Sequence, residues 1–512
     1  MNDQKEKTNF SLAFSRTHIY VVVIFLVALV ARIPAMKAHY ALGADDGVYG
    51  MSAVAISEGA RPFKGTFSSQ GGYFLELISA PSQIFNNLFW APRIVPILAG
   101  CCIAVCVFFL GKRFMPESLA LLAALSCAVS GTLLRTTGPI TSDGIVTLVI
   151  LICILTAFHF IDNPTFARAI VAGIALGFGT QIKNVFMIPV IIFLIALTIH
   201  TPFTKRLVAG FSAVIVFVLP FFLYGYRRVW DQSIAYHLEK HDERSLSTNL
   251  EKIFTTLSSF DLVYILLFLI ATFGFCAVLI RKFRSQQSFF VVIKSLFRIG
   301  SADPHNKRWE VRALAIFYFV PAVLLMVVQT PLFRNHLAII IPVGYVVMYS
   351  LAFDAYARRS DKLSRSVSMG ITGAVLAIIV TASLFSYIAT INNSTFKESR
   401  DHVQATRILK QIKNGSIVLT DDPGIAWSTG LRVPQMFTDA SRYRFSAETK
   451  SIQFTSDSFA QHVNAPNVCA AVQSPLQKPE LLNIDEWVPT TWQKAVRGKY
   501  TLWINPSREC LD

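Results

Sequence analysis

Long apolar stretches recur along this chain, and they constrain its fold more than any other feature. A helix that crosses the hydrocarbon core of a bilayer needs about 20 mostly apolar residues. Eleven stretches approach that requirement. The chain is 53% hydrophobic and only 15% charged, whereas soluble domains carry about 25% charged residues. We therefore expect a polytopic α-helical membrane protein with spans at 18–36, 91–110, 118–134, 143–161, 166–181, 184–200, 207–224, 259–280, 312–329, 336–353 and 369–391.

Basic residues between the stretches predict the orientation in the membrane. The formal net charge is +16, and no basic run accompanies a nucleic-acid-binding motif, so the charge is typical of cytoplasmic loops. The segment 281–312 alone carries eight Lys and Arg residues. The first stretch lacks a small-residue cleavage site, which favours a span over a signal peptide. With the N-terminus inside, the C-terminus lies outside together with 37–90, 135–142, 182–183, 225–258 and 330–335.

The part of the chain after the last stretch predicts a second domain. Residues 392–512 alternate helical and strand-like patterns, with "GSIVLTDD" and "KYTLWIN" as strands. We expect these residues to form a small extracytoplasmic α/β domain that follows a transmembrane domain of residues 1–391. Cys469 and Cys510 lie in this tail and could pair in an oxidising compartment, but their spacing alone does not establish the bond.

Two adjacent acids, Asp45 and Asp46, follow the first stretch in "YALGADDGVYGMSAVAISEG". One interpretation is helix capping, because a carboxylate at a helix N-terminus accepts backbone N–H bonds and favours the helix dipole. Capping explains one acid better than two. The other interpretation is a general base, because a carboxylate within hydrogen-bond reach can take the proton of an attacking hydroxyl. A second carboxylate beside it would raise its proton affinity.

This stretch resembles the first-loop signature of the GT-C membrane glycosyltransferases. It is similar in particular to the family 39 type, which includes protein O-mannosyltransferases and lipid A aminoarabinose transferases. Asp45, Asp46 and Tyr49 match an Asp, a following acid and a Tyr three residues on, although the family usually has Asp-Glu. The segments "APRIVPILAGCCIAVCVFFLGKRF", "TTGPITSDGIVTLVILI" and "GIALGFGTQIKNVFMIPV" resemble family spans in the same order, so the resemblance covers about residues 40–200.

The resemblance implies sugar transfer from a polyprenyl-phosphate donor to an acceptor hydroxyl of a glycan, lipid or protein. The reaction would take place on the outer face of a bacterial plasma membrane, with inversion at the sugar. Asp45 would be the base, assisted by Asp46, and Tyr49 would position the substrate. The leaving phosphate needs positive charge, which the resemblance assigns to Lys183 and Arg334. Snorkelling or interface anchoring is the alternative for these two residues.

Four further polar residues near the expected outer face are candidates for substrate positioning: Asp143, Arg135, His237 and His241. Asp143 begins a span, where capping is the alternative, and it could pair with Arg135. His237 and His241 are spaced i, i+4, which suits a metal on a helix, but no further ligands accompany them. We therefore expect no metal site and no cofactor, with a divalent cation as the open alternative.

The main rival function is a multispan transporter or a lipid flippase, because charged residues among many spans suit transport. The long outer segments, the soluble tail and the lack of an internal repeat favour the glycosyltransferase. A membrane-anchored sensor or assembly protein would leave the paired acids unexplained.

Overall fold

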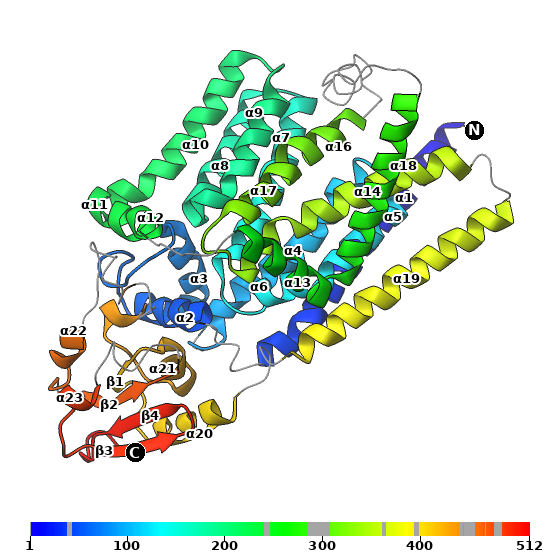
Figure 1. The fold of residues 1–512 in the computed structure, drawn as a ribbon. Coiled ribbons are helices and arrows are strands. Elements are labelled where there is room, and N and C mark those ends of the chain that lie inside the picture. Colours follow the sequence, from blue (N-terminus) through cyan, green and yellow to red (C-terminus); the bar gives the residue numbers. More distant parts are fainter. Residues whose placement is uncertain are drawn as a thin grey trace.

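The structure is a computed structural model of the chain, with a bundle of helices and a smaller α/β tail that packs beneath one end of it (Figure 1). Helices α2 (Ala44–Ser57) and α3 (Gly72–Ile84) lie at that end, which we call the α2 end. The structure describes residues 2–37, 44–85, 87–239, 246–284, 308–360, 365–393, 399–439, 444, 456–465, 467–475 and 484–511.

The apolar stretches form the helices of the bundle, and each predicted span overlaps one or more of them. These helices are α1 (Asn2–Lys37), α4 (Ala91–Lys112), α5 (Glu117–Ala128), α6 (Gly131–Thr137), α7 (Ser142–Asp162), α8 (Phe166–Ile182), η1 (Asn184–Met187), α9 (Ile188–Thr198), α10 (Phe203–Tyr224), α13 (Leu246–Phe260), α14 (Leu262–Arg284), α16 (Arg308–Leu314), η3 (Ala315–Phe319), α17 (Val320–Val328), α18 (Ile341–Ser360) and α19 (Arg365–Ile391).

Six helical segments of the described residues are long and apolar enough to cross a membrane. Two bent helix pairs raise that number to as many as eight, and three shorter apolar helices accompany them. These segments together correspond to the eleven predicted stretches. That all eleven cross the membrane stays a prediction.

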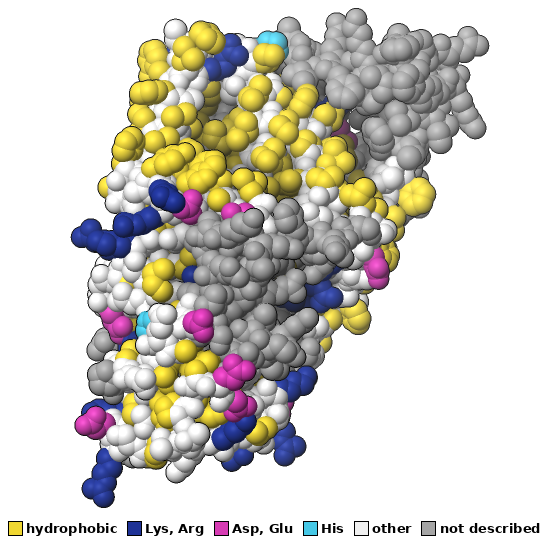
Figure 2. All heavy atoms as spheres, turned by 60° about the vertical axis from the view of Figure 1, so that its left-hand side comes forward, with side chains coloured by type: hydrophobic (Ala, Val, Ile, Leu, Met, Phe, Trp, Pro, Cys, Tyr) yellow, Lys and Arg dark blue, Asp and Glu magenta, His cyan; other side chains and the backbone are white. Residues whose placement is uncertain are grey.

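Small residues allow the tight helix contact between α8 and α10. A Cβ on Gly173 would lie 2.2 Å from the carbonyl oxygen of Ala209, and one on Gly177 would lie 2.3 Å from that of Ala213. Small residues four apart let membrane helices approach closely, because burial from water does not drive their association. Large hydrophobic side chains instead cover the outside of the bundle, as Figure 2 shows for one face. Such an apolar outer surface is typical of an integral membrane protein.

The predicted span at 118–134 is broken, and a second bend lies at the start of the span predicted at 259–280, directly after α13. The hydropathy pattern reveals neither bend. Helices α5 and α6 bend by 57° at their junction, and α13 and α14 bend by 114°. The two breaks meet, because the carboxylate of Asp261 between α13 and α14 accepts the backbone N–H of Thr132 at 3.1 Å. Ser130 caps α6 by accepting the N–H of Leu133. These contacts fix α6, which carries Arg135, against the start of α14.

The tail contains a four-stranded sheet with the order β1-β2-β4-β3. Strand β1 (Ile417–Thr420) is parallel to β2 (Val468–Gln473), whereas β4 (Tyr500–Ile504) is antiparallel to both β2 and β3 (Gln493–Arg497). In register, Leu419 faces Ala471, which faces Trp503. The predicted strands therefore form β1 and β4. The helices of the tail are α20 (Arg400–Leu409), α21 (Pro423–Thr429), α22 (Ser456–Ala460) and α23 (Ile484–Trp487).

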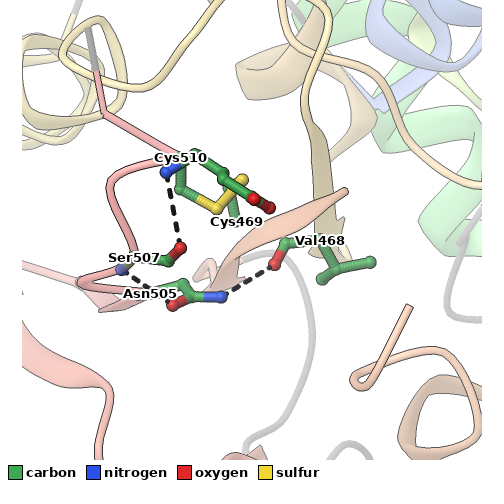
Figure 3. The surroundings of a disulfide bond; sticks show 6 residues. Val468, Cys469, Asn505, Ser507 and Cys510 are labelled. Atoms are coloured by element: carbon green, nitrogen blue, oxygen red, sulfur yellow. Dashed lines mark hydrogen bonds between the residues drawn. A yellow bond between two sulfur atoms is a disulfide. The ribbon is translucent and has the colours of Figure 1, made fainter. Parts of the chain in front are cut away.

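A disulfide joins Cys469 to Cys510, so the bond that the sequence left open is present (Figure 3). It ties the central strand β2 to the end of the chain. Cys510 also accepts the backbone N–H of Lys413 at 3.0 Å. Nearby, Asn505 donates to the carbonyl oxygen of Val468 and accepts the N–H of Ser507. The segment from Asn505 to Cys510 is therefore fastened to the sheet.

Candidate active site

The first turn of α2 carries both acids, and the structure gives them different surroundings. Asp45 is exposed, whereas Asp46 is buried. One oxygen of Asp46 lies 2.6 Å from Nη2 of Arg93, and the other accepts the backbone N–H of Ile140 at 2.6 Å. The second acid thus links α2 to α4 and to the connection before α7. Both carboxylates also favour the dipole of α2 from its first turn.

Arg93 in α4 is the residue at this site that the sequence reasoning missed. Its guanidinium carbon lies 4.7 Å from the ring centroid of Phe89, 5.6 Å from Trp90 and 5.1 Å from Trp427 of the tail. A cation over aromatic faces is attracted by the ring quadrupole, and more strongly when water is excluded. An arginine just inside the start of an apolar run, in "APRIVP", is the signal that could have indicated a buried ion pair.

Tyr49 lies one turn beyond the acids in the same helix and is also buried. Its hydroxyl accepts a hydrogen bond from Nε2 of Gln70 at 3.0 Å, and its ring packs edge-on against Phe74. Burial, with the nearby carboxylate of Asp45, raises the pKa of Tyr49 well above the ordinary value. The hydroxyl therefore keeps its proton and can act as a donor near Asp45.

The connection between α2 and α3 is held by the π-helical segment η2 (Asp231–Ala235). Nε2 of Gln232 donates to the carbonyl oxygen of Phe63 at 3.0 Å, and its Oε1 accepts the N–H of Ser68 at 3.0 Å. Phe63 is buried with a φ of 62°. A bulky residue rarely adopts that conformation, which costs energy and persists where its surroundings enforce it. The two hydrogen bonds of Gln232 hold the backbone around Phe63 in this conformation.

His237 in α12 (Tyr236–Leu238) contacts the same connection. Its Nε2–H donates to the carbonyl oxygen of Ser69 at 2.6 Å. The second histidine of the predicted pair, His241, lies outside the described residues. Within the described part of the chain, no three His, Cys, Asp or Glu side chains gather as metal ligands. The divalent cation stays an untested alternative.

Lys183 and Asp143 form an ion pair, with Nζ 2.8 Å from Oδ1. Lys183 directly follows α8 as its C-cap residue, and Asp143 lies in the first turn of α7. The capping alternative for Asp143 is wrong, because the side chain of Thr141 caps this helix by accepting the N–H of Gly144. The pairing with Arg135 that the sequence suggested is wrong as well, since the carboxylate of Asp143 meets Lys183 instead.

Arg135 and Arg334 lie close enough for their positive charges to interact. The guanidinium of Arg135 lies 4.5 Å above the ring of Phe260, and its buried Nη1 has no hydrogen-bond partner among the described residues. Arg334 begins η4 (Arg334–Ile339) and is exposed. Within the described part of the chain, neither arginine has a carboxylate at ion-pair distance. Two cations on elements that pack together, with no carboxylate paired to either among the described residues, are a potential binding site for a negatively charged group.

The ring of Phe186 joins these cations to Lys183. It lies 4.5 Å below Nζ of Lys183 and packs edge-on against His336, two residues after Arg334. Helix α6, which carries Arg135, also packs against η4. The structure therefore gathers Lys183, Asp143, Arg135 and Arg334 from four separate elements at the α2 end.

The segment 140–143 connects this cationic group to the acids of α2. At one end, the N–H of Ile140 is bound by Asp46, and at the other, Asp143 binds Lys183. A base on α2 and a cationic site are thus held by one short piece of chain. This arrangement could bind a phosphate group and deprotonate a hydroxyl near it.

Residues 72–224 match a family model described as dolichyl-phosphate-mannose-protein mannosyltransferase. This range contains Arg93, Arg135, Asp143 and Lys183, whereas Asp45 and the tail lie outside it. No curated protein sequence matches the chain.

Several solved structures share the fold along nearly the whole chain. ArnT from Cupriavidus metallidurans bound to undecaprenyl phosphate aligns with a TM-score of 0.63 at 12% identity, over 97% of this chain and 99% of that one. Its apo state aligns with a TM-score of 0.61 at 12% identity, over 97% and 100%. AglB of Archaeoglobus fulgidus, an oligosaccharyltransferase in complex with an inhibitory peptide and a dolichol-phosphate, gives 0.51 at 14% identity, over 90% and 69%.

At such low identity the likeness concerns the fold. The family match and the shared architecture confirm the resemblance that the sequence motifs indicated. The chain has the fold of the GT-C membrane glycosyltransferases, the superfamily that these structures represent.

Proposed function

We propose that the protein transfers a sugar from a polyprenyl-phosphate donor to an acceptor hydroxyl at the α2 end. The observation that carries the proposal is the segment 140–143, which Asp46 holds at one end and which holds Lys183 through Asp143 at the other. It couples an exposed carboxylate, Asp45, to a group of cations. A glycosyl transfer from a lipid phosphate needs both of these features.

The charges of the cationic group suit the leaving phosphate. Asp143 neutralises Lys183, so Arg135 and Arg334 contribute two positive charges that have no carboxylate counterpart among the described residues. A sugar phosphodiester carries one negative charge, and the phosphate monoester that leaves carries about 1.5 to 2. Binding that strengthens as negative charge develops lowers the barrier of the chemical step.

The acid side of the site suits a general base. Asp46 is buried against Arg93 and the N–H of Ile140, whereas Asp45 is exposed to an incoming acceptor, so we assign the proton to Asp45. The acceptor oxygen forms a bond to the anomeric carbon as the bond from that carbon to the phosphate oxygen breaks. The acceptor proton passes to Asp45, and polyprenyl phosphate leaves with the bonding electron pair. One displacement of this kind inverts the sugar configuration.

Two observations support the nature of the donor and the location of the site. Two of the structures of similar fold contain undecaprenyl phosphate or a dolichol-phosphate, which favours a lipid phosphate here too. The disulfide between Cys469 and Cys510 favours a tail in an oxidising compartment, as on the outer side of a bacterial plasma membrane.

A transfer assay with the purified, reconstituted protein tests the proposal. Undecaprenyl-phosphate sugars are supplied together with an envelope extract of cells that lack the gene. We expect free undecaprenyl phosphate to appear in step with a product whose anomeric configuration, read by NMR, is inverted. If no polyprenyl-phosphate sugar is consumed although the protein binds polyprenyl phosphate, the proposal is wrong and a carrier of the lipid becomes the better account.

A further inference from the structure

The tail contacts the acid-bearing helix α2 at very short range. A Cβ on Gly47 would lie 2.5 Å from the Cα of Gly424 in α21, and a Cβ on Gly50 would lie 2.6 Å from ring atoms of Trp427. The two helices can approach in this way only because Gly47 and Gly50 have no side chain. Helix α21 lies directly against α2 in Figure 1 as well.

Trp427 is the central residue of this contact. Its side chain is 3% exposed, and its indole N–H donates to the carbonyl oxygen of Leu88 at 2.9 Å. Its ring lies 4.7 Å from that of Phe89, so it packs against the segment that leads into α4. One side chain of the tail therefore contacts both α2 and the start of α4.

Arg93 connects Trp427 to the acids. The guanidinium carbon lies 5.1 Å from the ring of Trp427, and Nη2 lies 2.6 Å from Asp46. A buried ion pair is favourable only while its geometry is good, because both charges have lost their water. The aromatic ring that packs against Arg93 therefore limits where Asp46 can lie.

We propose that Trp427 is a positioning residue for Asp45, acting through Arg93 and Asp46. Asp45 precedes Asp46 in the same helical turn, so a shift of Asp46 moves Asp45 with it. A misplacement of about 1 Å at a reacting group can lower a rate about 100-fold. The tail is on this account a structural component of the active site. The inference rests on the proposed function, since it assigns Asp45 the role of base.

The test uses Trp427→Ala and Trp427→Phe in the full-length protein, each with Asp45 and with Asp45→Asn. We expect Trp427→Ala to lower kcat about 10- to 100-fold, with a much smaller change in the KM of the donor, because Lys183 and Arg334 do not contact Trp427. Trp427→Phe keeps an aromatic face for Arg93 and should restore most of kcat. In the Asp45→Asn protein, Trp427→Ala should cause no further loss, because residues that act as one unit are not additive.

Trp503→Ala is the matched control. Trp503 in β4 is buried in the core of the tail and donates to Asp485 in α23, and β1 and α21 lie between β4 and α2 in Figure 1. It should lower the unfolding temperature while the folded protein keeps its kcat. A Trp427→Phe protein as slow as Trp427→Ala, or a loss that multiplies with that of Asp45→Asn, would overturn the inference.

The assay separates this inference from the proposed function. If Asp45→Asn slows transfer and Trp427→Ala does not, the positioning role is wrong and the proposed function stands. If the unaltered protein consumes no lipid-phosphate sugar, or Asp45→Asn keeps its rate, the assignment of the base is wrong and the positioning role is overturned with it.

Discussion

Two carboxylate–cation pairs at the α2 end have the same chemistry and opposite surroundings. Asp46 and Arg93 are each 1% exposed, and aromatic rings pack against the guanidinium. Asp143 is 3% exposed, but its partner Lys183 is 14% exposed. Nζ of Lys183 lies over the ring of Phe186, which packs against His336, two residues after Arg334. The first pair is closed off from water. In the second pair, Nζ keeps donors that a phosphate can use while Asp143 holds the lysine in place.

The burial of an ion pair in this site decides whether the pair stabilises the fold or can also bind a ligand. A fully enclosed pair fastens three elements together, whereas a pair with one accessible member can take part in binding. The following predictions test this distinction, from the largest expected effect to the smallest.

The largest effect is expected from breaking the enclosed pair. Asp46→Ala leaves Arg93 buried without its counter-charge, which should lower the free energy of unfolding by about 3–5 kcal/mol. Asp143→Ala should cost less, because Lys183 can reach water. Thermal unfolding of both variants in the same detergent measures the difference. The double variant Asp46→Asn with Arg93→Met should regain part of the loss, and equal destabilisation by Asp46→Ala and Asp143→Ala would contradict the distinction.

The accessible pair should affect the donor. Lys183→Ala removes a charge-assisted contact to the phosphate worth about 1.5–3 kcal/mol, which corresponds to about a 10- to 150-fold lower transfer rate. Binding of undecaprenyl phosphate should weaken too, and Lys183→Arg should keep part of both. Lys112→Ala at the opposite end of the bundle is the control, because Lys112 pairs with Glu117 there. Unchanged donor binding by Lys183→Ala would make this lysine an interface anchor.

Asp421 and Asp422 in the tail show what burial does to carboxyls that have no cation at ion-pair distance among the described residues. Burial raises the pKa of Asp421 to about 7 and that of Asp422 to about 6. A carboxyl with a raised pKa contributes stability that is complete below about pH 4. That contribution is lost as the pH rises through the raised value. Stability should therefore fall by up to about 1.4 kcal/mol per pH unit and per group, between pH 4 and 7 for Asp421 and between pH 4 and 6 for Asp422.

Thermal unfolding of the protein at pH 5, 6 and 7 measures this loss. Asp421→Asn keeps an acceptor for the N–H of Ser474 and should remove most of the pH dependence above pH 6. A variant with the same pH dependence as the unaltered protein would refute this assignment.

The smallest effect is expected at the rim of the tail contact. Arg432 of the tail pairs with Glu58, the residue after α2, at 2.7 Å, with side-chain exposures of 22% and 45%. Exposed pairs of this kind contribute about 0.2–1 kcal/mol. Arg432→Ala should lower stability by no more than that and leave transfer unchanged, as a salt titration of the unfolding temperature can check. A large loss of transfer would mean that the rim, and not Trp427, holds the tail on α2.

The sequence predicted most helices of the bundle, two of the four tail strands and four residues that lie together at the α2 end. Apolar runs, strand patterns and short motifs are local, so they can be recognised without the fold. The contacts that organise the site join distant residues, such as Trp427 with Leu88 and Asp46 with Arg93. No local pattern specifies such partners.

The helix breaks escaped prediction for a related reason. Hydropathy averages across Ser130, so the span at 118–134 looks continuous, and α13, which ends just before Asp261, lies in a segment that the sequence assigns to an outer connection. The bend depends on the bond between Asp261 and Thr132, which only the packed bundle provides. The same limit applies to Asp143, whose partner Lys183 is 40 residues away and not the nearer Arg135.

The most direct test of the account is the rate of sugar transfer by Asp45→Asn. Asn is about as favourable as Asp near a helix N-terminus, so the folded protein and its unfolding temperature should be preserved. Loss of the proton acceptor should lower transfer about 10²- to 10⁴-fold while binding of undecaprenyl phosphate persists. A stable Asp45→Asn protein that transfers sugar at the normal rate would show that Asp45 is not the base.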